Sequence, residues 1–356
     1  MTLITVAVGA ILVWWGAAVT TRDVGLAVPD WPLSFGSLNP KGWLGIPAFR
    51  LEHGHRLLAA GVGLLVLAMY FWIFTKEKPR LVEAVGLVLS GVGYLFLIRT
   101  GHLRLGSAFV VWGLIWWGMT WAAQRWTLAR AMTTFALMLV IVQASLGGLR
   151  VLEMSDPFGI VHGTLGQLFF CVLVLIAIVS SRGWRESGWT NPGIGLRMAR
   201  GVTTLLFSAV FLQLVVGAVL RHTQRVHLVA HDLLTTAGYG VPPVSEVDAF
   251  VLFLHKAWGC VVALLVLMVA VWSRRWLAPK SVVGWLPWVL ILLPLVQVAL
   301  GVAVIQTGSS FWVTNFHVIN GLALLTLSFM LMVITWRGSG ALVEASPEGD
   351  ASASAV

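Results

Sequence analysis

Long apolar runs, separated by short polar stretches, dominate the pattern along this chain. Each run has about 20 residues, the length that an α-helix needs to cross the hydrocarbon core of a bilayer. A membrane β-barrel would show much shorter alternating segments instead. The pattern therefore predicts an all-α integral membrane protein with about ten transmembrane helices, at 3–21, 54–74, 82–98, 105–124, 131–150, 162–181, 201–220, 254–273, 284–305 and 317–336.

The composition excludes a soluble enzyme. Of the 356 residues, 58% are hydrophobic and 10% are charged, against about 45–50% and about 25% in soluble domains. The net charge of +9 belongs to the short loops between apolar runs, as in other membrane proteins, so nucleic-acid binding is not expected. Cys171 and Cys260 both lie inside apolar runs, and no disulfide framework is predicted.

The basic loops favour one orientation in the membrane. Lysine and arginine gather in the loops after the even-numbered spans, which predicts a cell (inner) membrane protein with both termini in the cytoplasm. No charged segment precedes the first apolar run, so this run is predicted to be an uncleaved span. The tail at 337–356 is small, polar and acidic, and is predicted to be disordered.

An internal repeat relates the two halves of the chain. His255 follows His55 by 200 positions, whereas His317 follows His162 by 155. The difference indicates an insertion of about 45 residues in the first half, which is enough for two helices. We therefore expect two tandem pseudo-symmetric four-helix bundles in parallel orientation. The predicted segments are an N-terminal unit at 1–181 with inserted helices at about 82–124, a cytoplasmic linker at 182–200, a C-terminal unit at 201–336 and the tail.

Four of the nine histidines occupy equivalent repeat positions: His55, His162, His255 and His317. Each is expected in the first turn of an even-numbered span, near the outer face. A polar side chain in a span is costly and usually functional, although a single histidine can also be a packing partner. Two imidazoles from two helices of a bundle are typical of haem ligation. Since no cysteine or carboxylate recurs with them, zinc fits poorly.

Four cations accompany these histidines. Arg56 and Lys256 directly follow His55 and His255, and Arg150 and Arg221 end odd-numbered spans on the same predicted face. Haem carries two propionates, which suit arginine or lysine partners. The alternative is that these side chains extend to the membrane interface without binding haem.

Glu52 breaks the symmetry between the halves. It precedes His55 by three residues, and the equivalent residue before His255 is Leu252. This difference favours divided roles, in which one haem is chemically altered and the other passes electrons. A carboxylate near the first haem could relay protons or stabilise positive charge. Alternatively, Glu52 only solvates the end of a loop.

Several motifs together resemble the haem A synthase family. They are TRDVGLAVPDWPLSFG (21–36), EHGHRL (52–57), QASLGG (143–148), HGTLGQ (162–167), QLVVGAVLRHT (213–223) and NFHVINGLALL (315–325). The resemblance extends over nearly the whole chain except residues about 80–127. It implies oxidation of the C8 methyl of haem O to a formyl group by successive hydroxylations, which gives haem A for terminal oxidases. The implied partners are haem O synthase, oxidase assembly factors and membrane lipid, with homo-oligomerisation left open.

The resemblance also implies a role for each candidate residue. Haem b would lie between His255 and His317 with Lys256 and Arg221, and the haem O substrate near His55 and His162 with Arg56 and Arg150. Glu52 matches the catalytically important acidic residue of the family.

Two other functions fit the same residues. The chain could be a non-enzymatic di-haem b-type cytochrome that passes electrons from a quinol pool, or a haem carrier. Many family members also carry a cysteine pair in the first outer loop, and residues 32–50 contain no cysteine here. The inserted helices at 82–124 are a second departure from the family pattern.

Overall fold

The computed structural model describes residues 1–74, 91, 93, 127–186, 189–191, 196–223, 232–281 and 283–337. In these residues eight helices are long and apolar enough to cross a membrane, so the protein is an all-helical, multi-pass membrane protein. They are α1 (Thr2–Thr21), α2 (Pro47–Phe74), α5 (Leu128–Glu153), α6 (Asp156–Val179), α8 (Arg197–His222), α10 (Val247–Ser273), α11 (Leu286–Gln306) and α12 (Phe311–Arg337).

Eight of the ten predicted spans are confirmed, since each coincides with one of these helices. The predicted inserted helices at 82–98 and 105–124 lie outside the described residues, as does the tail beyond Arg337. Two short helices, η1 (Trp43–Gly45) and α7 (Arg182–Glu186), complete the described elements. Helix α7 and the start of α8 occupy part of the segment predicted as a linker.

The prediction that each histidine lies in the first turn of its helix is wrong. Helix α2 begins at Pro47 and α10 at Val247, each eight residues before its histidine. Helices α6 and α12 begin six residues before theirs. Hydropathy marks only where an apolar run begins, whereas the helical backbone extends further, into polar residues such as Glu52. Consequently Glu52 and His55 both lie on α2.

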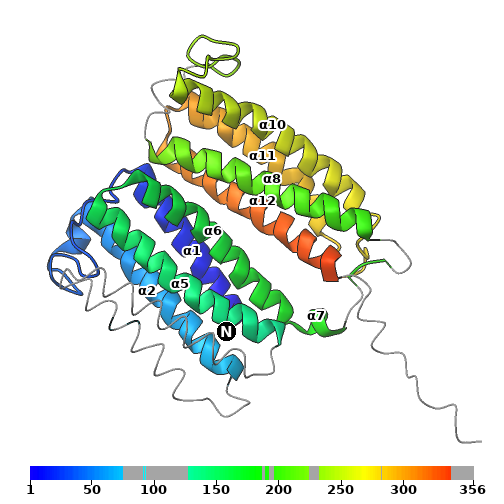
Figure 1. Ribbon diagram of the computed structural model, residues 1–356, viewed down its shortest axis with the longest axis horizontal. Helices are drawn as coiled ribbons and strands as arrows, with labels where there is room; N and C mark the ends of the chain where they lie inside the picture. Colours follow the sequence, from blue (N-terminus) through cyan, green and yellow to red (C-terminus); the bar gives the residue numbers. More distant parts are fainter. Residues whose placement is uncertain are drawn as a thin grey trace, which may run out of the picture. The chain divides into compact units, whose positions relative to one another are not determined.

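The chain divides into two compact units. Unit 1 contains residues up to Ser180 together with a short segment around Arg221 and His222, and unit 2 contains most of the rest. Within unit 1, α1 packs against α2 and α6, and α5 packs against α2 and α6, so each helix has two neighbours (Figure 1).

In unit 2, α11 packs between α10 and α12 (Figure 1). Helix α8 is attached to α12 by a buried hydrogen bond of 2.9 Å between the hydroxyls of Thr203 and Thr335. Arg200 Nε also donates to the Thr335 carbonyl at 3.1 Å. Polar pairs of this kind hold transmembrane helices together, because lipid offers them no alternative partner.

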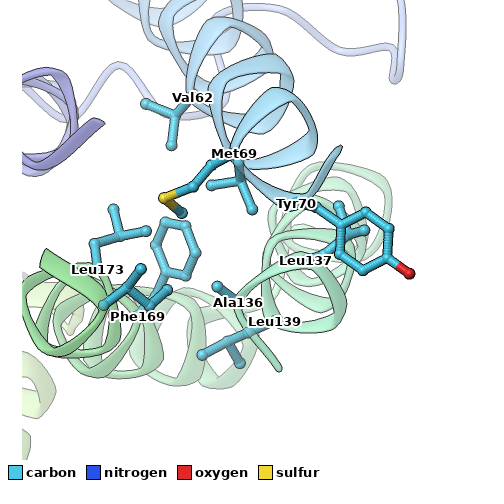
Figure 2. Packing of buried hydrophobic residues seen from close by; sticks show 10 residues of the cluster. Val62, Met69, Tyr70, Ala136, Leu137, Leu139, Phe169 and Leu173 are labelled. Atoms are coloured by element: carbon cyan, nitrogen blue, oxygen red, sulfur yellow. The ribbon is translucent and has the colours of Figure 1, made fainter. Parts of the chain in front are cut away.

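The core of unit 1 lies along α2 beyond the histidine. Val62 and Met69 of α2 meet Ala136 of α5 and Phe169 and Leu173 of α6 (Figure 2). These side chains are buried, and several are inaccessible to solvent. The tight packing fixes the helices of unit 1 against one another, and thereby fixes the residues that they carry.

We expect Met69→Ala to destabilise the protein by about 2–5 kcal/mol, because the cavity left by a buried side chain is only partly refilled. Leu64→Ala is the matched control, since Leu64 lies on the same helix and is 67% exposed, against 1% for Met69. Thermal unfolding in detergent measures the difference. Equal midpoints for the two variants would contradict this description of the core.

Candidate functional site

Two histidines face each other in unit 1. His55 comes from α2 and His162 from α6, and their ring centroids are 6.4 Å apart, with 78° between the ring planes. The backbone carbonyl of Gln143 on α5 lies 3.1 Å from His162 Nδ1. The structure thus brings together the two histidines that the repeat predicted for the first unit.

Unit 2 contains a second pair with the same spacing. His255 of α10 and His317 of α12 have ring centroids 6.4 Å apart, with 59° between the ring planes. All four rings are half-buried, unlike the inaccessible side chains of the core. Each pair therefore lies inside its unit and keeps part of its surface open.

A glycine on the preceding helix lies against each of the four rings. A β-carbon at any of these glycines would come within 3.0–3.3 Å of an imidazole atom, which is tighter than ordinary packing. The rings could not occupy these positions beside a larger residue without a shift of the neighbouring atoms. The glycine–histidine pairs are Gly16–His55, Gly147–His162, Gly217–His255 and Gly301–His317.

The spacing of both pairs fits a haem. Metal–imidazole bonds are about 2.0–2.1 Å long and a ring nitrogen lies about 1.2 Å from the ring centre, so imidazoles on opposite sides of one ion have centres roughly 6.5 Å apart. The described residues contain no group of three or more His, Cys, Asp or Glu side chains placed to hold a metal. Two imidazoles suffice for haem iron, because the porphyrin supplies the other four ligands.

Glu52 is buried in unit 1, with 4% of its surface exposed. Its Oε2 accepts from the Val28 backbone N–H at 2.8 Å. Its Oε1 pairs with the guanidinium of Arg56 at 2.6 Å, one turn further along α2. The carboxylate is thus connected to the loop between α1 and α2. Leu252, the equivalent residue in unit 2, is equally buried at 4%.

Arg56 has its hydrogen-bonding groups directed at the same loop. Its guanidinium donates to the backbone carbonyls of Val28, Asp30 and Leu33 at 2.6–3.0 Å, in addition to Glu52. The expectation that Arg56 binds a haem propionate stays a prediction. In this structure its partners are loop carbonyls and one carboxylate.

Lys256 has the corresponding position and contacts in unit 2. Its Nζ donates to the carbonyls of Asp232 and Thr235, both at 2.8 Å. The cation after the first histidine of each unit therefore attaches a loop to a helix. The expected binding of a propionate by Lys256 also stays a prediction.

The loop before α2 and the loop before α10 also share a turn. Ser34 and Ser37 exchange backbone hydrogen bonds of 3.0 Å around Phe35 and Gly36, which both have positive φ. In unit 2 the same turn runs from Thr236 to Tyr239, with positive φ at Ala237 and Gly238. Glycine adopts this backbone conformation without steric cost, which favours it at the second central position.

The other two candidate cations lie in unit 1. Arg150, in the last turn of α5, is half-buried, and its guanidinium makes no hydrogen bond or ion pair with any described residue. Its guanidinium lies beside Gly25 and Gly159, where a β-carbon would be 2.8 and 2.9 Å away. Arg221 donates to the Ala17 carbonyl and, at 2.5 Å, to Thr21 Oγ1. Arg221 thus belongs to unit 1, whereas the sequence analysis assigned it to the second haem.

The structure adds two histidines that the repeat did not select. His53 Nδ1 lies 2.8 Å from Ser34 Oγ, and its ring packs against Trp43 at a centroid distance of 4.9 Å. His222 is buried in unit 1 beside Gly159 and Gly163 of α6. Neither has an equivalent in the other half of the sequence, so a search based on repetition could not find them.

Residues 47–329 match the family of cytochrome oxidase assembly proteins (COX15-CtaA). This stretch covers most of both units, and the protein belongs to that family. The chain is similar to a protein named heme A synthase from Halalkalibacterium halodurans, with 22% identity over 333 residues, 91% of this chain and 93% of the relative. A heme A synthase from Shouchella clausii is 24% identical over 324 residues, 90% and 91% of the two chains. The family resemblance of the motifs is confirmed.

Proposed function

We propose that this protein is a haem A synthase, which oxidises the C8 methyl of haem O to a formyl group by successive hydroxylations. The observation that carries the proposal is the pair of histidine sites with equal spacing, only one of which has a buried carboxylate nearby. Membership of the cytochrome oxidase assembly family and the names of the two relatives support the same function.

The two sites would have different occupants. His55 and His162 would hold the haem O substrate in unit 1, and His255 and His317 would hold a resident haem b in unit 2. Bound haem b supplies one-electron transfer. The shared spacing, glycines and loop turns support a tandem duplication of one four-helix bundle.

Glu52 would act as a proton acceptor for the oxidation. If water supplies the oxygen, each hydroxylation converts a methyl group and one water into a hydroxymethyl group, two protons and two electrons. The electrons would leave one at a time through haem b to an external electron acceptor, and a carboxylate oxygen within the same unit can take up a proton. Val28 N–H and Arg56 hold the two oxygens in place. Because Leu252 occupies the equivalent position, unit 2 has no carboxylate for this role.

Arg150 is the best candidate for a propionate of the substrate. Its guanidinium is half-buried without a hydrogen-bond partner in the described part of the chain, whereas Arg56 and Lys256 are directed at loop carbonyls. An arginine can pair with a carboxylate through two parallel N–H bonds. Of the four cations considered as propionate partners, Arg150 is therefore the one proposed for the haem in unit 1.

The proposed membrane orientation and partners of the enzyme follow from the loop charges and from the proposed reaction. Both termini would lie in the cytoplasm of a cell with an inner membrane, and both haem sites near its outer face. Haem O synthase would supply the substrate, and oxidase assembly factors would receive the product. Lipid surrounds the spans, and self-association of the chain is compatible with this arrangement.

The proposal is tested by extraction of the non-covalent haems from protein co-expressed with a haem O synthase, followed by chromatography and mass analysis. We expect haem b together with haem A or its hydroxylated precursor, in about equal amounts. Haem b alone, at two per chain with haem O available, would instead identify a di-haem electron-transfer cytochrome. Haem A that appears only when it is added from outside would indicate a carrier.

A further inference from the structure

Three nitrogen-bearing side chains gather in unit 1 at the ends of two helices. Arg150 lies in the last turn of α5, and Arg221 and His222 end α8, in the short segment that belongs to this unit. A β-carbon at Gly159 of α6 would be 2.8 Å from His222 Nδ1 and 2.9 Å from Arg150 Nε. Both nitrogens therefore converge on the surface of α6 at this glycine.

Arg221 reaches the same place along the end of α1. It donates to Thr21 Oγ1 at 2.5 Å. The guanidinium of Arg150 lies against Gly25, four residues further along the chain, where a β-carbon would be 2.8 Å from Nη1. The two guanidinium groups are close enough for their positive charges to repel each other, and both act on His222. We call Arg150, Arg221 and His222 the cation cluster.

Several nitrogens of the cation cluster have no hydrogen-bond partner in the part of the chain that the structure describes. Arg221 Nε and His222 Nδ1 are buried without one, and the guanidinium of Arg150 makes no hydrogen bond either. His222 as a whole is only 9% exposed. A buried donor without an acceptor is costly, and an arginine N–H can only donate. The cluster is therefore built to receive a hydrogen-bond acceptor.

The charge of the cation cluster favours an acceptor that is an anion. No carboxylate of the described residues forms an ion pair with the cluster. Asp23, Glu52 and Asp156 attract Arg150, but none comes within ion-pair distance of it. A carboxylate can accept from two guanidinium N–H groups at once, and such charge-assisted bonds are about twice as strong as neutral ones. The chemistry of these donors therefore fits a carboxylate.

The cation cluster lies beside one of the candidate iron ligands. Gly159 and Gly163 are four residues apart and share one face of α6. A β-carbon at Gly163, which directly follows His162, would be 3.4 Å from His222 Nε2. The cluster and His162 are thus within one turn of each other on α6. A haem bound by His162 would have its edge within the same part of unit 1.

We infer that Arg150 does not act alone: Arg150, Arg221 and His222 together bind one propionate of the haem in unit 1, at the surface of Gly159. The inference rests on the proposed function and extends it to two further residues. The two arginines supply N–H donors with a permanent charge, and His222 Nδ1 donates when it carries the ring proton. The haem O substrate would then be held at two points, its iron and its propionate.

A comparison of haem O with its dimethyl ester tests this inference. Esterification removes the propionate charges and leaves the porphyrin unchanged. The full-length protein, purified with one haem b per chain from a host without haem O synthase, is titrated with each haem under argon and without an electron acceptor. The Soret band measures binding. We expect the acid to bind at least about tenfold more tightly than the ester, because the ester loses the charge-assisted hydrogen bonds.

Three variants locate the effect in the cluster. Arg221→Gln and His222→Phe remove donors, and each should weaken binding of the acid about ten- to a hundredfold while it changes binding of the ester less than about twofold. Gly159→Ala keeps every charge but adds a methyl group within 2.8–2.9 Å of both nitrogens, and it should also weaken binding of the acid. The controls are Arg50→Gln, which removes an exposed charge, and Gly61→Ala, which adds a methyl group where nothing lies within 4 Å. Both controls should leave the ratio of acid to ester affinity unchanged.

Equal affinities for the acid and the ester in the unaltered protein would overturn the inference. A ratio that Arg221→Gln and His222→Phe leave unchanged would do the same. An acidic phospholipid that copurifies with the unaltered protein and is lost from these variants would place a lipid headgroup in the site, and would likewise overturn it. Haem A formation is measured separately. If no haem A forms while the acid keeps its advantage and the variants remove it, the proposed function fails but the carboxylate site stands.

Discussion

Glu52→Gln should lower haem A formation at least about a hundredfold while both haems remain bound, because proton transfer by a positioned side chain contributes roughly 10²–10⁴ to a rate. Glutamine has nearly the size of glutamate and can still accept from the Val28 N–H. It cannot take up a proton as a carboxylate does. The ratio of haem A to haem O, extracted from protein co-expressed with a haem O synthase, measures the effect.

The control must separate the proposed proton transfer from the shape of the loop between α1 and α2, since Glu52 also hydrogen-bonds to this loop. Asp30 accepts from the N–H groups of Phe35 and Gly36 and thereby supports the turn in the same loop. Asp30→Asn weakens these contacts and leaves Glu52 unchanged. We expect it to retain most of the activity. If Glu52→Gln forms haem A within about threefold of the unaltered protein, the carboxylate has no role in the proton transfer.

His255→Ala should remove haem b from unit 2 and abolish haem A formation. Without one of its two imidazoles this site would hold haem iron much less tightly. Unit 1 would then have no resident electron carrier. Optical spectra and the haem content per chain measure the loss, which should leave only the haem bound in unit 1.

His162→Ala is the reciprocal variant. It removes a ligand with the same environment, a glycine and a glutamine on the preceding helix, but in the other unit. We expect this protein to retain haem b and to lose haem O and haem A. If the two variants lost the same haem, the assignment of one haem to each unit would be wrong.

The positions of the spans could be predicted from the sequence because twenty apolar residues have no soluble alternative in a chain of this composition. The starts of the helices could not, since the first two turns of α2 contain Arg50, Glu52 and His53, which no hydropathy average includes in a span. The early start of α2 places Glu52 on the same helix as His55, whereas the sequence also allowed Glu52 to lie in a loop.

The histidine pairs could be predicted because the repeat in the sequence places the same residue type at a fixed offset. The partners of Arg56 could not, because carbonyls of residues 28–33 come within its reach only after the loop folds back over α2. The positive charge of Arg56 alone suggested that it binds a haem propionate. The contacts of Gln213 and Gln297 with imidazole nitrogens could not be predicted either, because they depend on how the helices pack.

The differences between the units gather in one pair of helices. The α5–α6 pair has the same glutamine, glycines and histidine as α11–α12. In contrast, α1 and α2 differ from α8 and α10 at three equivalent positions. Leu12 corresponds to Gln213, Glu52 to Leu252 and Ala59 to Gly259. Such clustering of the differences in α1 and α2 is expected if these two helices acquired the proposed oxidation activity while the other helices retained the ancestral binding site.

The two loops attach to their helices largely through main-chain oxygens, at Val28, Asp30 and Leu33 in one unit and at Asp232 and Thr235 in the other. Every residue type offers the same carbonyl, so these hydrogen bonds tolerate substitution of the loop side chains. A cysteine pair introduced between residues 32 and 50 would therefore add a cross-link to a loop that is already attached to its helix.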